Sequence, residues 1–174
     1  MARTIDDMLC KALELTEKAV QAYRKAKANC SEALGLEVFG LLLKDKEEAA
    51  RRIADIRASL GQGKKFADAC RLPEDESRDL STVLARLSAK YAVPKGSCLT
   101  EKESLKMAAD LEQAGISFFE AEKPQAADKT EKEFVEFMLA EGRGHFMLIR
   151  DMQSYYEDPE DWTRTKGRGG LDGA

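Results

Sequence analysis

The chain is poor in the residues on which most catalytic and metal sites depend. It has a single histidine, His145, and its four cysteines stand far apart with no Cys-x-x-Cys pair among them. One histidine excludes Ser-His-Asp or Cys-His catalysis anywhere else in the chain, and the cysteine spacing is not that of a zinc or iron–sulfur site. We therefore interpret the cysteines as ordinary thiols, and His145 as the one obvious candidate for metal binding or proton transfer.

Long apolar runs and an excess of basic residues are also missing. The longest uncharged apolar stretch, residues 38–43, is too short to span a bilayer, and residues 1–11 mix acids into what would be a signal peptide. Lys and Arg total 28 against 32 Asp and Glu, which gives a net charge of -4 and argues against nucleic acid as a partner. We expect one cytoplasmic domain over residues 1–174, with no membrane or nucleic-acid partner.

Proline is scarce, and its four positions, 73, 94, 124 and 159, divide the chain into long stretches of helical composition. Apolar residues recur three and four apart in these stretches, as on one face of a helix. Three Thr-x-x-Asp/Glu capping boxes, at residues 4–7, 100–103 and 130–133, favour helix starts. The pattern predicts an all-α fold with a helix pair over 4–60, a crossover with its own short helix over 61–99, a second helix pair over 100–157 and an irregular tail over 158–174.

The second half of the chain repeats the first at a shift of 96 residues. This shift superposes Thr4 on Thr100 and aligns many apolar positions of the two helix pairs, such as Leu9 with Leu105. A shift of 95 pairs Leu9 with Ser104 and spoils the apolar register. Two antiparallel helix pairs joined by a long crossover form a four-helix bundle with one long connection, rather than a bundle in which all loops are short.

The second half also resembles a known family. Glu112-x-x-Gly115-x-x-Phe118-Phe119 and the run Met138 to His145 resemble the rubrerythrin-like branch of the ferritin-like superfamily, as do Tyr155 to Trp162 and the ending Leu171-Asp-Gly-Ala174. The resemblance covers nearly the whole chain and is strongest from Glu112 onward. It implies a ferritin-like four-helix bundle and, by analogy with relatives, a homodimer.

The resemblance also implies a dinuclear metal site, of two irons or of iron and manganese, inside the bundle. Its ligands are one Glu from each of two helices and a Glu-x-x-His from each of the other two, since residues three apart share a helix face. The matching residues of this chain are Glu112, Gly142 and His145 in the second half and Thr16, Lys46 and Ala49 in the first. Only Glu112 and His145 keep the family's ligand types. The ammonium of Lys46 would oppose a divalent cation, or it would pair with Glu112 in place of a metal.

Acids beside these positions leave an alternative open. Glu17, Glu47 and Glu141 each stand next to a ligand position, and the 95-residue shift would recruit Glu17 and Glu47 to join Glu112 and His145. One residue along a helix rotates a side chain by about 100°, so this alternative needs a local bulge or shift.

Two functions follow from these observations, and a mononuclear site of Glu112, His145 and a neighbouring acid lies between them. The resemblance implies a redox enzyme or an iron-handling protein, which would need an external electron donor because the chain lacks the rubredoxin-like cysteine pairs. The replaced ligands favour a metal-free helical bundle that acts as a structural or partner-binding module. The first function would need iron or another divalent metal as a cofactor, and the second would need no cofactor.

Overall fold

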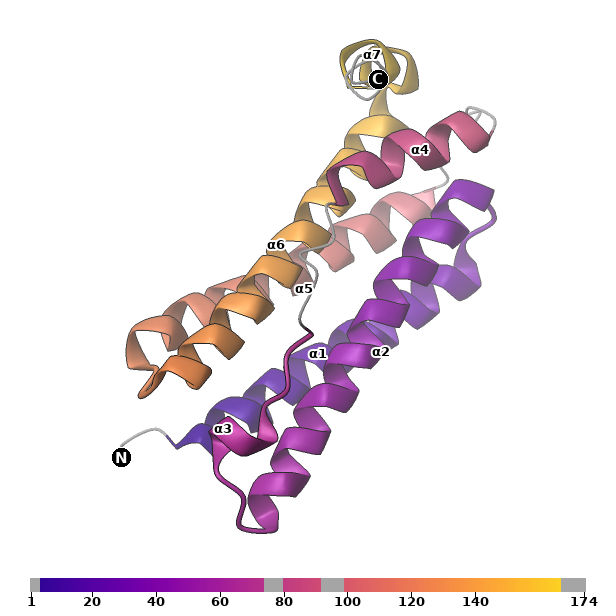
Figure 1. Cartoon of the computed structure of the whole chain (residues 1–174). Coiled ribbons are helices and arrows are strands. Elements are labelled where there is room, and N and C mark those ends of the chain that lie inside the picture. The colour runs from indigo at the N-terminus through magenta and orange to yellow at the C-terminus, as the bar shows by residue number, and fades with distance from the viewer. Residues whose placement is uncertain (1–3, 74–79, 92–98, 167–174) are drawn as a thin grey trace.

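The described part of the chain folds into helices. The computed structural model describes residues 4–73, 80–91 and 99–166, and no strand occurs within these ranges. Four long helices dominate: α1 (Ile5–Asn29), α2 (Ala33–Gly61), α5 (Leu99–Glu122) and α6 (Lys129–Glu157). α1 packs along α2 and α5 along α6, and the two pairs meet along α1 and α5 (Figure 1). The predicted all-α class is confirmed.

The first helix pair begins and ends at the signals that the sequence predicts. The Thr4 capping box is formed, because the backbone N–H of Asp7 donates to Thr4 Oγ1 at 3.1 Å and that of Thr4 donates to Asp7 Oδ2 at 3.0 Å. α2 ends at Gly61, and Gly63 follows with a φ of 84°, a conformation that glycine adopts without strain.

The helix bounds of the second pair support the 96-residue shift. α6 begins 96 residues after α2 and ends 96 residues after it. α5 continues into the short η2 helix (Lys123–Gln125), which ends 96 residues after α1 does. The two pairs are therefore built on one register, and this register places matching residues at matching depths.

The cap of α6 differs from the one that the sequence predicts. α6 begins at Lys129, and its cap is Asp128, whose carboxylate accepts from the backbone N–H of Glu131 at 2.9 Å. The predicted Thr130 cap is wrong, because an aspartate two residues earlier is at least as good a cap as threonine. α5 begins at Leu99, and the side chain of the predicted cap Thr100 lies outside the described residues.

The crossover lies along the side of the molecule where α2 faces α6. It contains α3 (Phe66–Ala69), the η1 turn (Leu80–Thr82) and α4 (Val83–Lys90), of which α3 and α4 each contact both α2 and α6. Leu80 is buried beside Gly144, where its nearest methyl carbon lies 3.5 Å from the position that a glycine Cβ would take. The short helix predicted in the crossover is confirmed as α4.

The predicted irregular tail is corrected in its first part, because residues Pro159–Thr165 form the helix α7. The carboxylate of Asp158 caps it by accepting from the backbone N–H of Asp161, and Pro159 occupies the first turn, where its missing N–H costs nothing. Trp162 is buried against the ring of Tyr155, with 5.3 Å between centroids. The rest of the predicted tail, residues 167–174, lies outside the described residues.

The core consists of two apolar clusters separated by a polar layer. On α1 the two clusters contain Ala12 and Ala19, and Thr16 lies between them. On each of the other long helices a polar residue takes the corresponding place. We call these four side chains the polar layer: Thr16, Lys46, Glu112 and His145. No helix in the described ranges is long and apolar enough to cross a membrane.

Candidate functional site

The structure brings the six predicted ligand positions together inside the four long helices. Each helix contributes at least one, because the spacing of three and four keeps them on the inward face. All six positions are buried: Thr16, Lys46, Ala49, Glu112, Gly142 and His145.

Lys46 points inward and forms a buried ion pair with Glu112. Its Nζ lies 2.9 Å from Glu112 Oε2, and the side chains of Lys46 and Glu112 are 9% and 2% exposed. Burial alone would lower the pKa of Lys46, but the carboxylates of Glu112 and Glu141 raise it above its usual value. Burial would raise the pKa of Glu112, but the charge of Lys46 and the contacts with His145 and Tyr23 lower it to about 2. Both groups are therefore charged at neutral pH.

Tyr23, on α1, donates a further hydrogen bond to Glu112. Its phenol O–H donates to Glu112 Oε1 at 2.5 Å, and the Tyr23 side chain is fully buried. Burial and the neighbouring carboxylate raise the pKa of Tyr23 well above its usual value. The phenol is consequently held neutral as a hydrogen-bond donor.

His145 bridges the buried ion pair to a second carboxylate. Its Nε2 lies 3.1 Å from Asp45 Oδ2, and its Nδ1 lies 3.5 Å from Glu112 Oε1, too far for a well-formed hydrogen bond. Burial and the charge of Lys46 would lower the pKa of His145, but Asp45 and Glu112 outweigh them and raise it. The imidazole is therefore held between two acids, one of which reaches the surface.

The replaced ligand positions are satisfied without a metal. The hydroxyl of Thr16 donates to the backbone carbonyl of Ala12 at 2.8 Å, within its own helix. Ala49 is fully buried among apolar side chains. A Cβ on Gly142 would lie 3.3 Å from Ile116 Cγ1 and 3.7 Å from Glu112 Oε2, so this position packs directly against the ion pair.

Of the three additional acids, the structure brings only Glu141 close to the polar layer. Its Oε1 lies 3.9 Å from Lys46 Nζ. Glu17 is exposed, and Glu47 points outward to form an ion pair with Arg24 at 2.7 Å. The 95-residue register is corrected accordingly, because α1 and α2 have no bulge that would rotate these two acids inward.

A small cavity lies against the polar layer. It is lined by Thr16, Lys46, Glu112 and Gly115 among others and has a volume of about 20 Å³, enough for a single water molecule. Nothing lies within 4 Å of the position that a Cβ on Gly115 would take. The cavity is thus much smaller than a typical substrate site.

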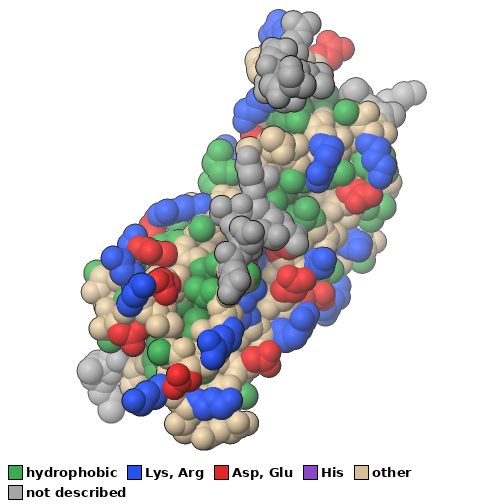
Figure 2. All heavy atoms as spheres, in the orientation of Figure 1, with side chains coloured by type: hydrophobic (Ala, Val, Ile, Leu, Met, Phe, Trp, Pro, Cys, Tyr) green, Lys and Arg blue, Asp and Glu red, His purple; other side chains and the backbone are tan. Residues whose placement is uncertain are grey.

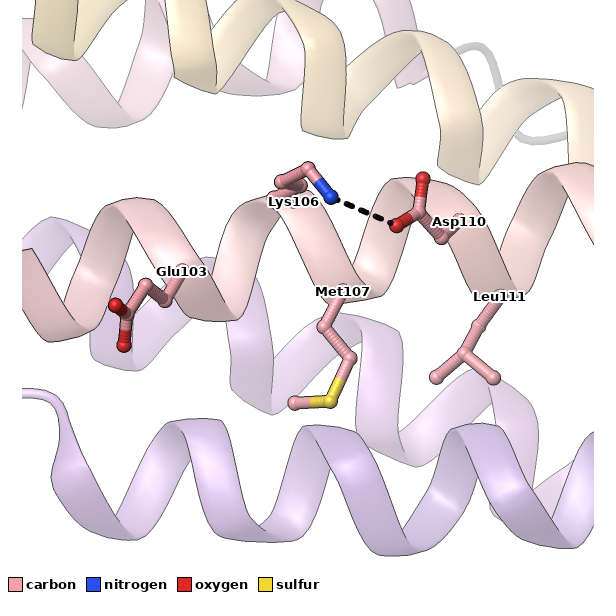
Figure 3. Close-up of a pocket in the computed structure, with 5 residues that line it drawn as sticks. All are labelled: Glu103, Lys106, Met107, Asp110 and Leu111. Carbon is pink, nitrogen blue, oxygen red and sulfur yellow. Dashed lines mark hydrogen bonds and ion pairs between the residues drawn. The ribbon is translucent and has the colours of Figure 1, made fainter.

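A larger hollow of about 430 Å³ lies along α5 and shares Leu111 with this cavity. Met107 and Leu111 point toward the N-terminal helices, whereas Lys106 and Asp110 form an ion pair along the helix at 3.5 Å (Figure 3). Met107 is 41% exposed. This hollow is open and carries no buried charge, so its chemistry suits contact with another surface better than catalysis.

The residues present do not fit a dinuclear metal centre. Glu112 and His145 are the only donors of the family's types at the six positions, and the ammonium of Lys46 occupies the space beside Glu112. Within the described ranges, no three His, Cys, Asp or Glu side chains form a group suited to hold a metal ion. A divalent cation beside Glu112 would have to displace this ammonium.

Sequence reasoning found the ion pair but missed part of its surroundings. The sequence did indicate Tyr23, because this residue matches Phe119 in the repeat and only the tyrosine carries a hydroxyl. The sequence offered no signal for Asp45, since this residue stands outside the apolar stripe of α2.

Comparison with protein-family models, with curated proteins and with solved structures finds no match to this chain.

Proposed function

We propose that this protein is a ferritin-like four-helix bundle of the rubrerythrin-like type in which a lysine has taken over the place of the metals. The proposal rests on three features together: two helix pairs in one 96-residue register, a crossover along one side, and six inward positions at the spacing of the family's ligands. The long connection between the pairs matches the topology of that bundle class.

We further propose that the protein works without metal, as a structural or partner-binding module. The observation that carries this proposal is the 2.9 Å contact between Lys46 Nζ and Glu112 Oε2. In a dinuclear carboxylate site the metals balance the charge of the buried carboxylates. Here the ammonium of Lys46 balances the charge of Glu112, the one carboxylate that remains at the six positions. The iron-dependent redox alternative has less support, because four of the six ligand positions offer no family ligand.

The dependence of stability on metal tests this proposal. A metal that binds only the folded chain raises the unfolding temperature, and a chelator reverses the rise. We expect Fe²⁺, Mn²⁺ and Zn²⁺, each tested without oxygen, to change the unfolding temperature by less than about 1 °C, with EDTA equally without effect. A rise of several degrees with Fe²⁺ or Mn²⁺ that EDTA reverses would sink the metal-free account.

We also propose that the chain forms a homodimer and that the hollow around Met107 belongs to the interface. The exposed thioether, flanked by Lys106 and Asp110, offers apolar contact with charges of both signs beside it. Sedimentation analysis should show a dimer for the wild type and for Met147→Lys, and a monomer for Met107→Lys. Met147 is the matched control, because it is also an exposed methionine and lies on α6. A monomeric wild type would refute the dimer.

A further inference from the structure

An arginine-rich depression lies on the surface where α2 meets the segment after α3. It has a volume of about 390 Å³, and Arg51, Arg52 and Arg71 line it together with Glu48 and Asp55. Figure 2 shows Lys and Arg side chains, with acids among them, along the face that α2 presents. The depression is separate from the polar layer, and the proposed function makes no use of it.

Arg52 is the residue that makes this depression more than a solvated surface. Its Nη1 is buried and has no hydrogen-bond partner. Its guanidinium lies over the ring of Phe137 on α6, with 4.8 Å from Cζ to the ring centroid. The ring stabilises the cation but cannot accept the hydrogen bond that Nη1 offers in the plane of the guanidinium. A buried donor without an acceptor is costly, and an anion in the depression would supply the acceptor.

The acids of the depression do not neutralise these arginines by contact. Glu48 Oε1 faces Lys44 Nζ at 4.0 Å instead, and the described residues include no acid in an ion pair with Arg51, Arg52 or Arg71. Three guanidinium groups against two carboxylates leave a local excess of positive charge on a chain whose net charge is -4. The charges of Arg52 and of Glu133, a residue of α6, act in opposite directions on the pKa of the Cys70 thiol.

We propose that this depression binds a small phosphate-bearing anion. The planar fork of a guanidinium matches the oxygens of a phosphate group and forms two charge-assisted hydrogen bonds with it. Arg52 is held in place by Phe137, whereas Arg51 and Arg71 are exposed and close on the anion from α2 and from the segment after α3. The volume suits a small solute, and the two acids on the rim disfavour a nucleic-acid backbone.

Calorimetric titration of the full chain with inorganic phosphate, pyrophosphate and chloride tests the proposal. We expect both phosphates to bind, pyrophosphate more tightly, and Arg52→Gln to weaken each by about tenfold or more. Arg71→Gln should weaken both in the same way, and this variant guards against misfolding because Arg71 is exposed and lies outside the helices. Arg86→Gln, an exposed arginine on α4, should bind as the wild type does.

Three results would overturn the proposal. They are no binding of either phosphate at concentrations up to about 10 mM, equal binding by the wild type and both depression variants, or the same response to chloride as to phosphate. Because no metal and no residue of the polar layer takes part, the outcome is independent of the proposed metal-free function.

Discussion

At the scale of single residues, Lys46 determines the chemistry of the interior. A carboxylate as deeply buried as Glu112 is costly unless its charge is balanced, and the ammonium at 2.9 Å balances it. Tyr23 and His145 add contacts to the same carboxylate. The layer is therefore a small, mutually dependent network, and removal of one member leaves another without its partner.

Replacing Lys46 with methionine should strongly destabilise the fold, because it leaves Glu112 buried without a counter-charge. We expect a loss of about 3 kcal/mol or more in the free energy of unfolding, measured with urea. The matched control is Lys44→Met, which removes an ammonium that is 67% exposed and should change the free energy by less than about 0.5 kcal/mol. The double variant Lys46→Met/Glu112→Gln should recover part of the loss. Equal stability of Lys46→Met and the wild type would show that the pair is not formed.

Lowering the pH should reduce the free energy of unfolding, because Glu112 becomes protonated. Its pKa falls from 4.5 in the unfolded chain to about 2 in the folded one, so the unfolded chain takes up the proton first. The stability that the ionised carboxylate contributes, of order 3 kcal/mol, is complete above about pH 4.5 and is lost as the pH falls toward 2. Urea unfolding of the wild type and of Glu112→Gln over this range should show a steeper loss in the wild type. Parallel curves would contradict the shift.

His145 should titrate above its usual pKa of 6.5, because Asp45 and Glu112 favour the imidazolium. The stability gained from this shift is present below pH 6.5 and is lost as the pH rises through the folded-state pKa. As the only histidine, it gives a single pair of imidazole C–H signals in NMR, and a titration reads its pKa without assignment to a residue. Asp45→Asn should lower that pKa. A wild-type value at or below 6.5 would contradict the arrangement.

The sequence was sufficient to predict the centre of this layer but not its edge. The 96-residue register placed Thr16, Lys46, Glu112 and His145 on one inward face, because helical spacing determines direction. It could not place Asp45, which reaches His145 from a neighbouring helix across 100 residues of sequence and belongs to no periodic pattern. Tertiary contacts of this kind depend on how two helices are rotated against each other, which periodicity does not specify.

At the scale of elements, the repeat explains most of the fold, and local capping explains the differences. The repeated apolar pattern sets a common register for α2 and α6, whose bounds differ by 96 residues. The start of α6 and the helix α7 depend instead on Asp128 and Asp158, two caps that the sequence interpretation passed over. The register was predictable because it sums over many residues, whereas a helix end depends on one or two.

Two helical glycines should respond in opposite ways to the same substitution. A Cβ on Gly35 of α2 would overlap Cys30 Sγ and lie 3.2 Å from the hydroxyl oxygen of Tyr156, so Gly35→Ala should cost about 1 to 3 kcal/mol. A Cβ on Gly115 of α5 meets nothing within 4 Å, so Gly115→Ala should gain about 0.5 to 1 kcal/mol from helix propensity alone. Urea unfolding of both variants measures the difference. The same sign for both would mean that the close approach at Gly35 is absent.

At the scale of the whole molecule, the two apolar clusters and the polar layer form one continuous interior. The crossover lies along the side between α2 and α6, and α1 and α5 pack against each other where the pairs meet. The cavity that Thr16, Lys46 and Glu112 line has a volume of about 20 Å³, enough for about one water molecule. The molecule as a whole thus combines an interior arranged around one ion pair with open hollows on its surface, where we propose that partners and anions bind.

The metal content of the purified protein tests the central claim most directly. The protein should be produced in iron-supplemented cells, purified without chelators and analysed for all transition metals by mass spectrometry. If Lys46 balances Glu112 in place of a metal, the content should be below about 0.1 metal per chain, because a cation would have to displace the buried ammonium. About two metals per chain, lost on substitution of Glu112 or His145, would contradict the account.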